Sequence, residues 1–467
     1  MSKKRIAIIG AGISGLGCAY GLRNHPDLEI TIYEAGNHIG GHSNTVDIEI
    51  DTPDGKIKHG VDTGFLVFNR RTYPRLVRLF EELQVPIFPS EMSFSVKLET
   101  APSLEWAGND LNSFFGQRRN VFRPAFWKMA FDIMRFNKLA TALAVAQMRD
   151  EPSLGSVTPP DESIADFLDR HRFSQPFREW YFLPMIGAIW SCSVDQMLEF
   201  PIQTMARFCH NHGLLQIQNR PQWLTVQGGS REYVKRLVAS LDARGVKWVR
   251  EPALKINAPL AGAGEQFIEV LSTSGAAQFD EVVMACHSDQ SLQLLSGIDK
   301  ASQAILNSIP YQANRAILHT DASFLPERKR CWAAWNYTAQ TKNSSISEDH
   351  VSVSYLINRL QPLPTAFNDV PIIVTLNPLR EPDPAKILQE IHYAHPVFDM
   401  RATQAQSTLA LIQGKSSIWY CGAWTGYGFH EDGLRSGELV AEAILELTNQ
   451  PDSQRPHQQV STLNAST

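Results

Sequence analysis

The sequence predicts an α/β protein with a Rossmann-like domain and a second domain. A short apolar run, Ile6–Ile9, has the composition of a buried parallel strand, and three glycines at G-x-G-x-x-G spacing and a helical stretch follow it directly. Near the other end of the chain, residues 418–444 repeat the order of strand, glycine loop and helix. The 467 residues exceed one compact core, so we expect two domains.

The first unit has the features of a dinucleotide site. Gly10 permits the tight turn from strand to helix, Gly12 lets the backbone approach a diphosphate, and Gly15 lets the helix pack closely on the strand. The helix N-terminus supplies N–H donors and a positive dipole. A second strand, Glu29–Tyr33, ends at Glu34, which is placed to accept hydrogen bonds from a ribose diol. Because all these parts are in register, we predict a dinucleotide site rather than an ordinary turn.

Composition and charge exclude several classes of protein. The 43% apolar and 19% charged residues are typical of a globular protein. The net charge of −5 means that the chain lacks the excess of Lys and Arg typical of nucleic-acid-binding proteins. No apolar signal region precedes the first strand, and no stretch reaches the roughly 20 apolar residues of a membrane span. The cysteines are scattered without a C-x-x-C pair, so we expect buried free thiols and a cytoplasmic protein: Cys18, Cys192, Cys209, Cys286, Cys331 and Cys421.

The middle of the chain is rich in aromatic residues. Residues 122–140 form the clearest predicted helix, with one apolar stripe: Phe122, Phe126, Met129, Ile133, Phe136 and Ala140. This basic amphipathic helix either meets a membrane interface or roofs a lipid tunnel, or it packs on its own core, and Trp127 and Phe131 on the basic side favour the core slightly. The uncharged stretch 181–191 lines an apolar cavity or is plain core. The pair His210-x-His212 lacks further ligands nearby, so we predict no metal site.

Further elements follow in order. Residues 73–84 predict an amphipathic helix, and Gly228-Gly229 begins another. Strand-like runs occur at 245–256, 267–271, 280–286, 315–320, 332–337, 351–356 and 372–376. After Asn449 the polar tail has no apolar periodicity, so we expect residues 450–467 to be disordered.

The residues after Glu34 resemble a known family. Six residues on lies the pair Gly40-Gly41, as in the long fingerprint of the flavin-containing amine oxidase superfamily, which includes monoamine oxidases, protoporphyrinogen oxidase and phytoene desaturase. The family usually has Arg where this chain has His42, a weaker diphosphate partner, so backbone amides should contribute more. The resemblance implies bound FAD, held at this end by Gly10, Ala11, Gly12, Ile13, Ser14, Gly15, Glu34, Ala35, Gly40, Gly41 and His42.

The resemblance assigns two more segments to the cofactor. In the family a D-x-G segment passes beside the isoalloxazine ring, and its glycine leaves room for the flavin; the match is Asp62-Thr63-Gly64-Phe65. A plain β-turn is the alternative. The backbone around Ala253 matches the segment that contacts the adenine.

The loop after the last predicted strand resembles the family's C-terminal flavin motif. It contains Gly422, Ala423, Trp424, Tyr427, His430, Glu431, Asp432 and Gly433. In the family the following helix points its N-terminus at the flavin, so amides near Asp432 and Gly433 would stabilise negative charge on the reduced ring. Ala423 stands where an acid usually holds the ribityl chain. His430 takes the position that faces the ring, which is often Tyr in amine oxidases.

These carry-overs give the candidate catalytic residues. We expect His430 to lie nearest to the reacting carbon, with Glu431 as a proton partner and with Trp424 and Tyr427 nearby. Arg315 is the best match to a Lys that often approaches flavin N5 through water. An Arg cannot act as a base at neutral pH, so Arg315 is an electrostatic or structural group, or an ordinary strand-end charge.

The resemblance implies a glutathione-reductase-type FAD domain, built from residues 1–90, 216–290 and 406–449. A substrate domain of mixed sheet and helices, residues 91–215 and 291–405, is inserted into it. The leading hypothesis is desaturase-like hydride transfer from an apolar, fatty-acyl or other lipid substrate to non-covalent FAD. The alternatives are a peroxide-producing amine oxidase, a double-bond isomerase of unsaturated fatty acids, and a flavin-binding protein without turnover. Residues 122–140 would provide peripheral membrane contact.

Overall fold

The computed structural model describes residues 3–52, 55–99, 103–149, 162–190, 197–216, 220–258, 267–342 and 345–449. The tail predicted to be disordered and Cys192 lie outside these residues. The other cysteines are free thiols. Among the described helices, none is both long and apolar enough to cross a membrane.

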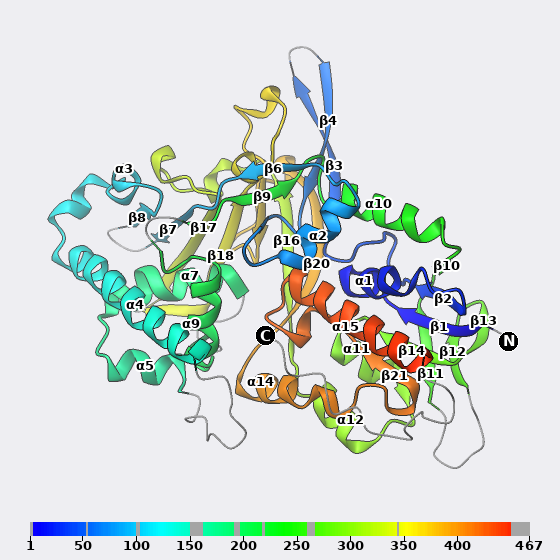
Figure 1. Ribbon diagram of the computed structural model, residues 1–467. Helices are drawn as coiled ribbons and strands as arrows, with labels where there is room; N and C mark the ends of the chain where they lie inside the picture. Colours follow the sequence, from blue (N-terminus) through cyan, green and yellow to red (C-terminus); the bar gives the residue numbers. More distant parts are fainter. Residues whose placement is uncertain are drawn as a thin grey trace.

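A five-stranded parallel sheet in the order β10–β2–β1–β14–β21 forms the centre of the first domain (Figure 1). Its strands come from three distant parts of the chain, and its register places Ile9 beside both Tyr33 and Met284. The predicted α/β fold with a Rossmann-like domain is therefore confirmed. The strands are β1 (Lys4–Ile9), β2 (Leu28–Tyr33), β10 (Lys247–Val249), β14 (Glu281–Met284) and β21 (Ile418–Tyr420).

Alternate residues of β1 serve two different layers. Ile6 and Ile8 pack against a helical layer, and Ala7 and Ile9 pack against a second sheet of order β13–β12–β11–β15. The helices are α1 (Ile13–Leu22), α10 (Arg231–Asp242) and α15 (His430–Asn449). The second sheet contains β11 (Ala253–Asn257), β12 (Ile268–Ser272), β13 (Gly275–Phe279) and β15 (Leu295–Ser296). Helices α11 (Ser288–Leu294), α12 (Lys300–Leu306) and α14 (Met400–Ser407) follow in the chain.

A seven-stranded mixed sheet and a group of helices form the second part of the molecule (Figure 1). The strand order is β20 (Ile387–Pro396), β16 (Tyr311–His319), β19 (Ile373–Leu376), β18 (Ser345–Leu356), β17 (Trp335–Lys342), β7 (Phe94–Glu99) and β8 (Leu104–Ala107). The helices include α3 (Leu111–Phe114), α4 (Pro124–Arg149), α5 (Ile164–Arg170), α6 (Gln175–Phe177), α7 (Leu183–Trp190) and α9 (Ile202–Asn211), with a π-helical turn at Arg178–Phe182. Their core is largely aromatic.

Shorter strands and two further helices lie outside the two large sheets. Strands β5 (Phe68–Asn69), β9 (Trp223–Val226) and β6 (Ile87–Ser90) form a small sheet, and β3 (Thr45–Thr52) pairs with β4 (Gly55–Asp62). Helix α2 (Pro74–Glu82) contacts α15, and α13 (Ile357–Leu360) follows β18.

Helix α4 supports part of each interpretation of its sequence. The predicted stripe does pack on a core, because Phe126, Met129, Phe136 and Ala140 are fully buried. Phe122, which lies before the helix begins at Pro124, is instead 86% exposed. The opposite face leaves three large apolar side chains in solvent: Trp127, Phe131 and Met134.

Candidate cofactor and substrate cavity

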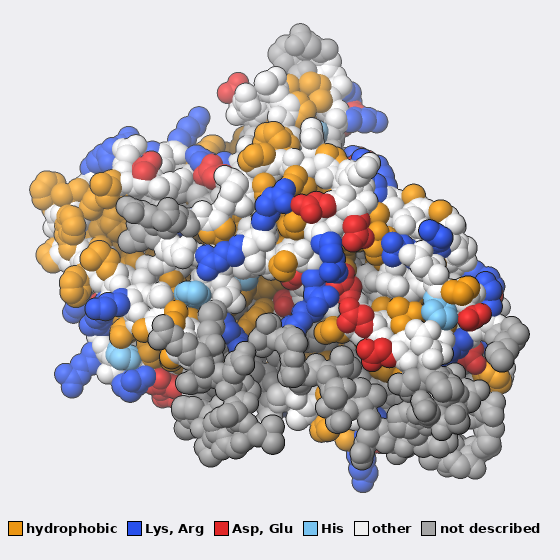
Figure 2. All heavy atoms as spheres, viewed as in Figure 1, with side chains coloured by type: hydrophobic (Ala, Val, Ile, Leu, Met, Phe, Trp, Pro, Cys, Tyr) orange, Lys and Arg blue, Asp and Glu red, His pale blue; other side chains and the backbone are white. Residues whose placement is uncertain are grey.

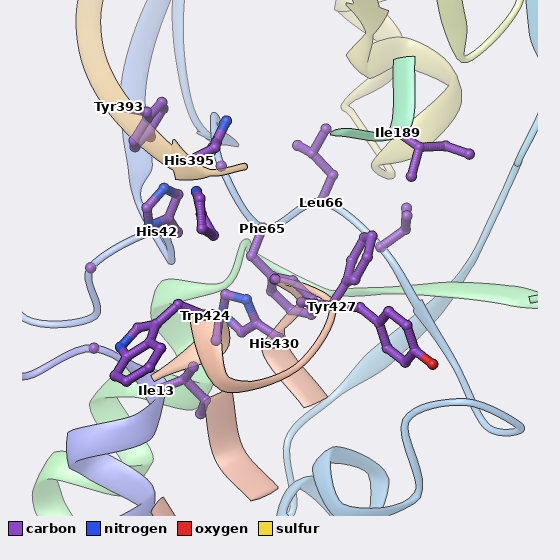
Figure 3. Close-up of a pocket in the computed structure, with 18 of the residues that line it drawn as sticks. Ile13, His42, Phe65, Leu66, Ile189, Tyr393, His395, Trp424, Tyr427 and His430 are labelled. Atoms are coloured by element: carbon purple, nitrogen blue, oxygen red, sulfur yellow. The ribbon is translucent and has the colours of Figure 1, made fainter. Parts of the chain in front are cut away.

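A cavity of about 1110 Å³ lies at the carboxyl ends of the parallel strands and continues toward the seven-stranded sheet. Its walls include residues directly after β1, β2, β14 and β21. Ligands of open α/β sheets bind at this edge. Figure 3 shows His42, Tyr393 and His395 gathered on one side of the cavity, with Leu66 and Ile189 on another and Phe65 and His430 between them.

The glycines of the first loop shape the nucleotide end of the cavity. Gly10 has φ +112°, and a Cβ there would lie 2.9 Å from the carbonyl oxygen of Ala285. A Cβ on Gly12 would have no described atom within 4 Å, so this backbone is open to a ligand. Gly15 does not line the cavity. Its missing Cβ would lie 2.0 Å from the carbonyl oxygen of Gly10, so this glycine serves the close packing of α1 on the strand.

Glu34 is held ready to accept further hydrogen bonds. One carboxylate oxygen accepts the amide hydrogen of Ala11 at 2.8 Å, and the other accepts that of Gly36 at 2.6 Å. A carboxylate oxygen has two lone pairs, so each can still accept a hydroxyl hydrogen. Glu34 and the neighbouring Ala35 line the cavity. This arrangement fits the ribose diol of a dinucleotide.

His42 is a half-buried side chain at the same end of the cavity, and its Nε2 atom is buried. Its Nε2 atom finds no hydrogen-bond partner among the described residues. The ring stacks on Tyr393 with 4.9 Å between centroids, and the centroid of His395 lies 5.3 Å away. Burial holds the pKa of His42 well below its ordinary value, and neighbouring histidines lower it further. The neutral ring therefore carries an orphaned polar atom that a ligand can satisfy.

The segment 62–65 is held by the protein itself. The buried carboxylate of Asp62 accepts hydrogen bonds from the amide and hydroxyl of Ser230, and burial raises its pKa to about 6. Asp62 does not line the cavity, although Thr63, Gly64 and Phe65 do. A Cβ on Gly64 would lie 2.3 Å from the carbonyl oxygen of His42. This glycine is thus required by the chain's own backbone, whereas the resemblance explained it by room for the flavin.

The C-terminal loop forms another wall. Gly422, Ala423, Trp424, Tyr427 and His430 line the cavity. The amide of Gly422 donates to Ser436 Oγ at 2.9 Å, which joins the loop to α15. The indole of Trp424 donates to the carbonyl oxygen of Cys286 at 3.3 Å, so it has a structural partner.

Asp432 and Gly433 lie away from the cavity, which differs from the expectation that their amides meet a flavin ring. The Asp432 carboxylate accepts the amide hydrogen of Phe429 at 3.0 Å, and burial raises its pKa to about 7. A Cβ on Gly433 would lie 2.9 Å from Ile13 Cγ2. These two residues therefore fasten the loop and allow α15 to approach the start of α1.

His430 is fixed in the cavity wall by three neighbours. Its Nε2 lies 2.8 Å from Ser43 Oγ and 3.2 Å from the hydroxyl of Tyr233, and its ring stacks on Phe65 with 3.9 Å between centroids. Burial lowers its pKa to about 3, so the imidazole is neutral at physiological pH. The structure thus places this candidate in the cavity as an uncharged ring.

Two candidate catalytic residues are not brought to the cavity. Arg315 donates to Glu381 and Glu390 at distances of 2.6 to 3.0 Å, and these partners are exposed. This geometry favours the strand-end charge over an approach to flavin N5. Glu431 accepts the amide hydrogens of Arg75 and Leu76 at 2.9 and 3.0 Å. Its carboxylate therefore caps α2, which makes it a structural residue instead of a proton partner.

The Glu431→Gln variant tests this assignment. Loss of the negative charge at the N-terminus of α2 should lower the free energy of unfolding by about 1 to 2 kcal/mol. We expect unchanged flavin content and unchanged rates of flavin reduction, because the side chain does not line the cavity. Thermal unfolding and stopped-flow reduction measure the two effects. A slower flavin reduction at unchanged stability would contradict the structural assignment and would support a catalytic role for Glu431.

Several cavity residues were not predicted from the sequence. Tyr393 and His395 come from the end of β20, and His287 stacks on Tyr311 with 4.4 Å between centroids. The alternation His392-Tyr393-Ala394-His395 beside Pro396 is the one sequence signal that could have indicated them.

The far end of the cavity is apolar. Its walls include Phe94, Trp106, Tyr181, Met185, Ala188, Ile189, Phe208, Leu214, Trp223, Trp335 and Tyr355. Among the described lining residues, the only Asp, Glu, Lys or Arg side chains are Glu34, Glu91 and Arg220. Glu91 pairs with Arg359 at 2.7 Å, and Tyr427 accepts a hydrogen bond from Arg207 at 2.7 Å.

The two histidines of the His210-x-His212 pair, where the sequence predicted no metal site, lie at the C-terminal end of α9. The ring of His212 stacks on Phe208 with 4.0 Å between centroids. Within the described ranges, no group of three or more His, Cys, Asp or Glu side chains is arranged to hold a metal ion.

Comparison with known proteins agrees with this geometry. Residues 8–83 match the NAD(P)-binding Rossmann-like domain family. Protoporphyrinogen oxidase 2 of Arabidopsis thaliana is 25% identical over 209 residues, which cover 42% of this chain and 34% of the plant protein. The match thus spans about a third of that relative's length.

Solved structures match nearly the whole chain. Cyclohexylamine oxidase from Brevibacterium oxydans superposes with a TM-score of 0.64 and 15% identity, covering 96% of this chain and 100% of that one. The CLA-producing fatty acid isomerase from P. acnes gives a TM-score of 0.64 and 15% identity, covering 94% and 98%.

Residues 8–83 thus form an NAD(P)-binding Rossmann-like domain, and the chain as a whole shares the fold of the solved amine oxidase and fatty acid isomerase structures. The nucleotide end of the cavity fits a dinucleotide on three observations: the open backbone at Gly12, the held carboxylate of Glu34 and the orphaned Nε2 of His42.

Proposed function

We propose that this protein is an FAD-dependent oxidoreductase that removes hydride from an apolar, fatty-acyl-type substrate. The observation that supports the proposal is the character of the cavity beyond the nucleotide end. Aromatic and aliphatic side chains line it, and its one carboxylate there, Glu91, is already paired with Arg359. An ammonium group would find no free carboxylate among the described residues that line this end of the cavity, whereas an acyl chain would find continuous apolar contact.

The chain's own residues would bind, orient and shield the substrate. FAD, when bound, supplies the hydride acceptor. Hydride removal would leave positive charge on carbon until the neighbouring carbon loses a proton and the double bond forms, and the neutral rings of His430, Phe65 and Tyr427 add no like charge beside it. The surrounding aromatic walls exclude water from the reacting carbon. In this proposal His430 is the protein group nearest to that carbon.

Anaerobic reduction of the holoprotein tests the proposal. Long-chain acyl lipids should bleach the visible band of the bound flavin, and monoamines and polyamines should leave it unchanged. Free FAD with the same lipids is the control. Bleaching by amines together with peroxide formation in air would defeat the lipid proposal. A shifted double bond without any requirement for an electron acceptor would assign the same cavity to an isomerase.

An exposed apolar surface supports a lipid source for the substrate. Figure 2 shows hydrophobic side chains gathered over α3 and the start of α4. We define this apolar surface by Leu111, Val121, Phe122, Trp127, Phe131 and Met134, each at least 40% exposed. In the fully described range 111–140 the only carboxylate, Asp132, is buried, and the exposed charges around the patch are basic: Arg118, Arg119, Lys128 and Lys138. We infer a cytoplasmic protein that binds an anionic membrane peripherally through this surface.

Vesicle binding tests this surface. The double variant Trp127→Ala with Phe131→Ala should bind vesicles of anionic phosphatidylglycerol at least about tenfold more weakly, since each buried aromatic contributes roughly 1.5 to 3 kcal/mol. Leu254→Ala, at a side chain that is 50% exposed on β11, is the matched control. Sedimentation with vesicles measures both. Equal binding of the double variant and the control would contradict the assignment.

A further inference from the structure

His42 stands at the sequence position where the superfamily usually has an arginine, and two further histidines lie near it. His42 follows Gly40-Gly41, and Gly40 forms an isolated β-bridge with Gly12 at the open start of α1. The ring centroid of His395 lies 5.3 Å from that of His42, and the centroid of His287 lies 6.5 Å from it. All three rings line the cavity. The diphosphate end of the site is therefore surrounded by imidazoles.

The tautomer of His395 is fixed by a chain of hydrogen bonds. The amide of Arg315 can only donate, and it donates to Asn377 Oδ1 at 3.0 Å. Asn377 Nδ2 must then donate to Asn314 Oδ1, at 2.8 Å, and Asn314 Nδ2 donates to His395 Nδ1 at 3.0 Å. Because Nδ1 accepts, the ring hydrogen of neutral His395 is on Nε2. His395 is thus held as a hydrogen-bond donor.

The backbone supports this chain of amides. Asn377 has a positive φ of 48°, and its own amide donates to the carbonyl oxygen of Arg315 at 2.8 Å. Asn314 also donates to the carbonyl oxygen of Gln312 at 3.1 Å, which fixes its amide in the same orientation. The two asparagines therefore act as positioning residues for His395.

The described groups that surround His42 carry no negative charge, so they favour binding of an anion. The titratable groups that face it are His38, His287, His395 and His430, together with the stacked phenol of Tyr393. No carboxylate is among these described neighbours. Burial and the other imidazoles lower the pKa of His42 and so favour the neutral ring. An anion against the orphaned Nε2 would stabilise the imidazolium instead.

We propose that His42, assisted by the fixed donor His395, binds the diphosphate of the dinucleotide and takes up a proton when it does so. Cofactor binding is then linked to pH, unlike recognition by a permanently charged guanidinium. This inference rests on the proposed flavin cofactor and is independent of the substrate. The sign follows from linkage: the bound anion raises the pKa of His42, so affinity is greatest below the pKa of the free protein, falls as pH rises toward the pKa of the complex, and levels off above it.

Calorimetric titration of the full-length protein, stripped of flavin, tests the proposal directly. FAD is titrated in two buffers of different ionisation enthalpy, which reports the protons taken up on binding. At a pH between the His42 pKa of the free protein and that of the complex we expect close to one proton, and in this range a Kd that rises by up to about tenfold per pH unit. ADP-ribose, which keeps the diphosphate, should take up the proton as well, and riboflavin should not.

Two variants and a control test whether His42 is the group that takes up the proton when FAD binds. His42→Arg should bind FAD with no proton uptake and with a flat pH profile, and Asn377→Ala should weaken FAD binding while keeping the uptake. His392→Gln, at an exposed position on β20, should behave as the native chain. FAD binding without proton uptake by the native chain, or unchanged uptake in His42→Arg, would overturn the proposal. Failure to bind FAD at all would instead refute the proposed cofactor.

Discussion

The Gly15→Ala variant is expected to lose its native fold. A Cβ at this position would lie 2.0 Å from the carbonyl oxygen of Gly10 and 3.1 Å from Ala285 Cβ, and the first of these is backbone that cannot move aside. Overpacking in a core costs about 1 to 3 kcal/mol even where side chains can adjust. The cost should exceed that range because α1 would have to move off β1.

The measurement for this variant is thermal unfolding together with soluble yield. We expect a strongly lowered melting temperature or recovery only as aggregate. Gly245→Ala, where a Cβ meets no described atom within 4 Å but φ is +76°, is a control for the backbone effect alone. If Gly15→Ala were as stable as the native chain, the tight crossing of strand and helix would be incorrectly described.

The Gly12→Val variant should give the opposite result, with a stable fold and no bound cofactor. Gly12 has φ −74° and ψ 179°, which a valine adopts without strain. A Cβ there meets no described atom within 4 Å, so the side chain would project into the cavity where we place the diphosphate. Loss of that close approach should weaken FAD binding by at least about 100-fold, which corresponds to roughly 2.7 kcal/mol.

Flavin content and the melting temperature of the stripped protein measure this prediction. The two glycines lie three residues apart, so the pair separates a packing role from a ligand role within one motif. Tight FAD binding by Gly12→Val would show that the cofactor does not approach this backbone. A destabilised apoprotein would show that Gly12 is needed for packing after all.

The parts of the site that the sequence predicted are those set by local spacing. The turn at Gly10, the close packing at Gly15 and the carboxylate of Glu34 each depend on residues within about one βαβ unit. The structure shows the expected geometry at the two glycines, and it places Glu34 in the cavity, where its contact with a ribose stays a prediction. The apolar stripe of α4 was likewise predictable, because helical periodicity fixes which side chains share a face.

The parts that the sequence did not predict depend on pairing between distant segments. His395 reaches His42 only because β20 pairs with β16 and ends at the cavity, and its tautomer depends on Asn377 from β19's end. Glu431 caps α2 across more than three hundred residues of sequence. No local pattern encodes such contacts. The π-helical turn at 178–182 adds one residue to a helical repeat, which periodicity does not resolve.

The resemblance to the amine oxidases was most informative about the fold and least informative about individual residues. It assigned Asp432 and Gly433 to the flavin, whereas the structure uses both to fasten the loop and α15. It explained Gly64 by the cofactor, whereas the carbonyl of His42 already requires a glycine there. A residue's role that is inferred from a family resemblance should therefore be checked against that residue's contacts in this structure.

The absorption spectrum of the purified protein tests the central claim most directly. Two glycine-bearing turns, one at each end of the chain, line one cavity, which we propose holds a single FAD. We expect yellow protein that releases one FAD per chain on denaturation, or that becomes yellow when FAD is added. Protein that stays colourless after incubation with FAD and gel filtration would contradict the account.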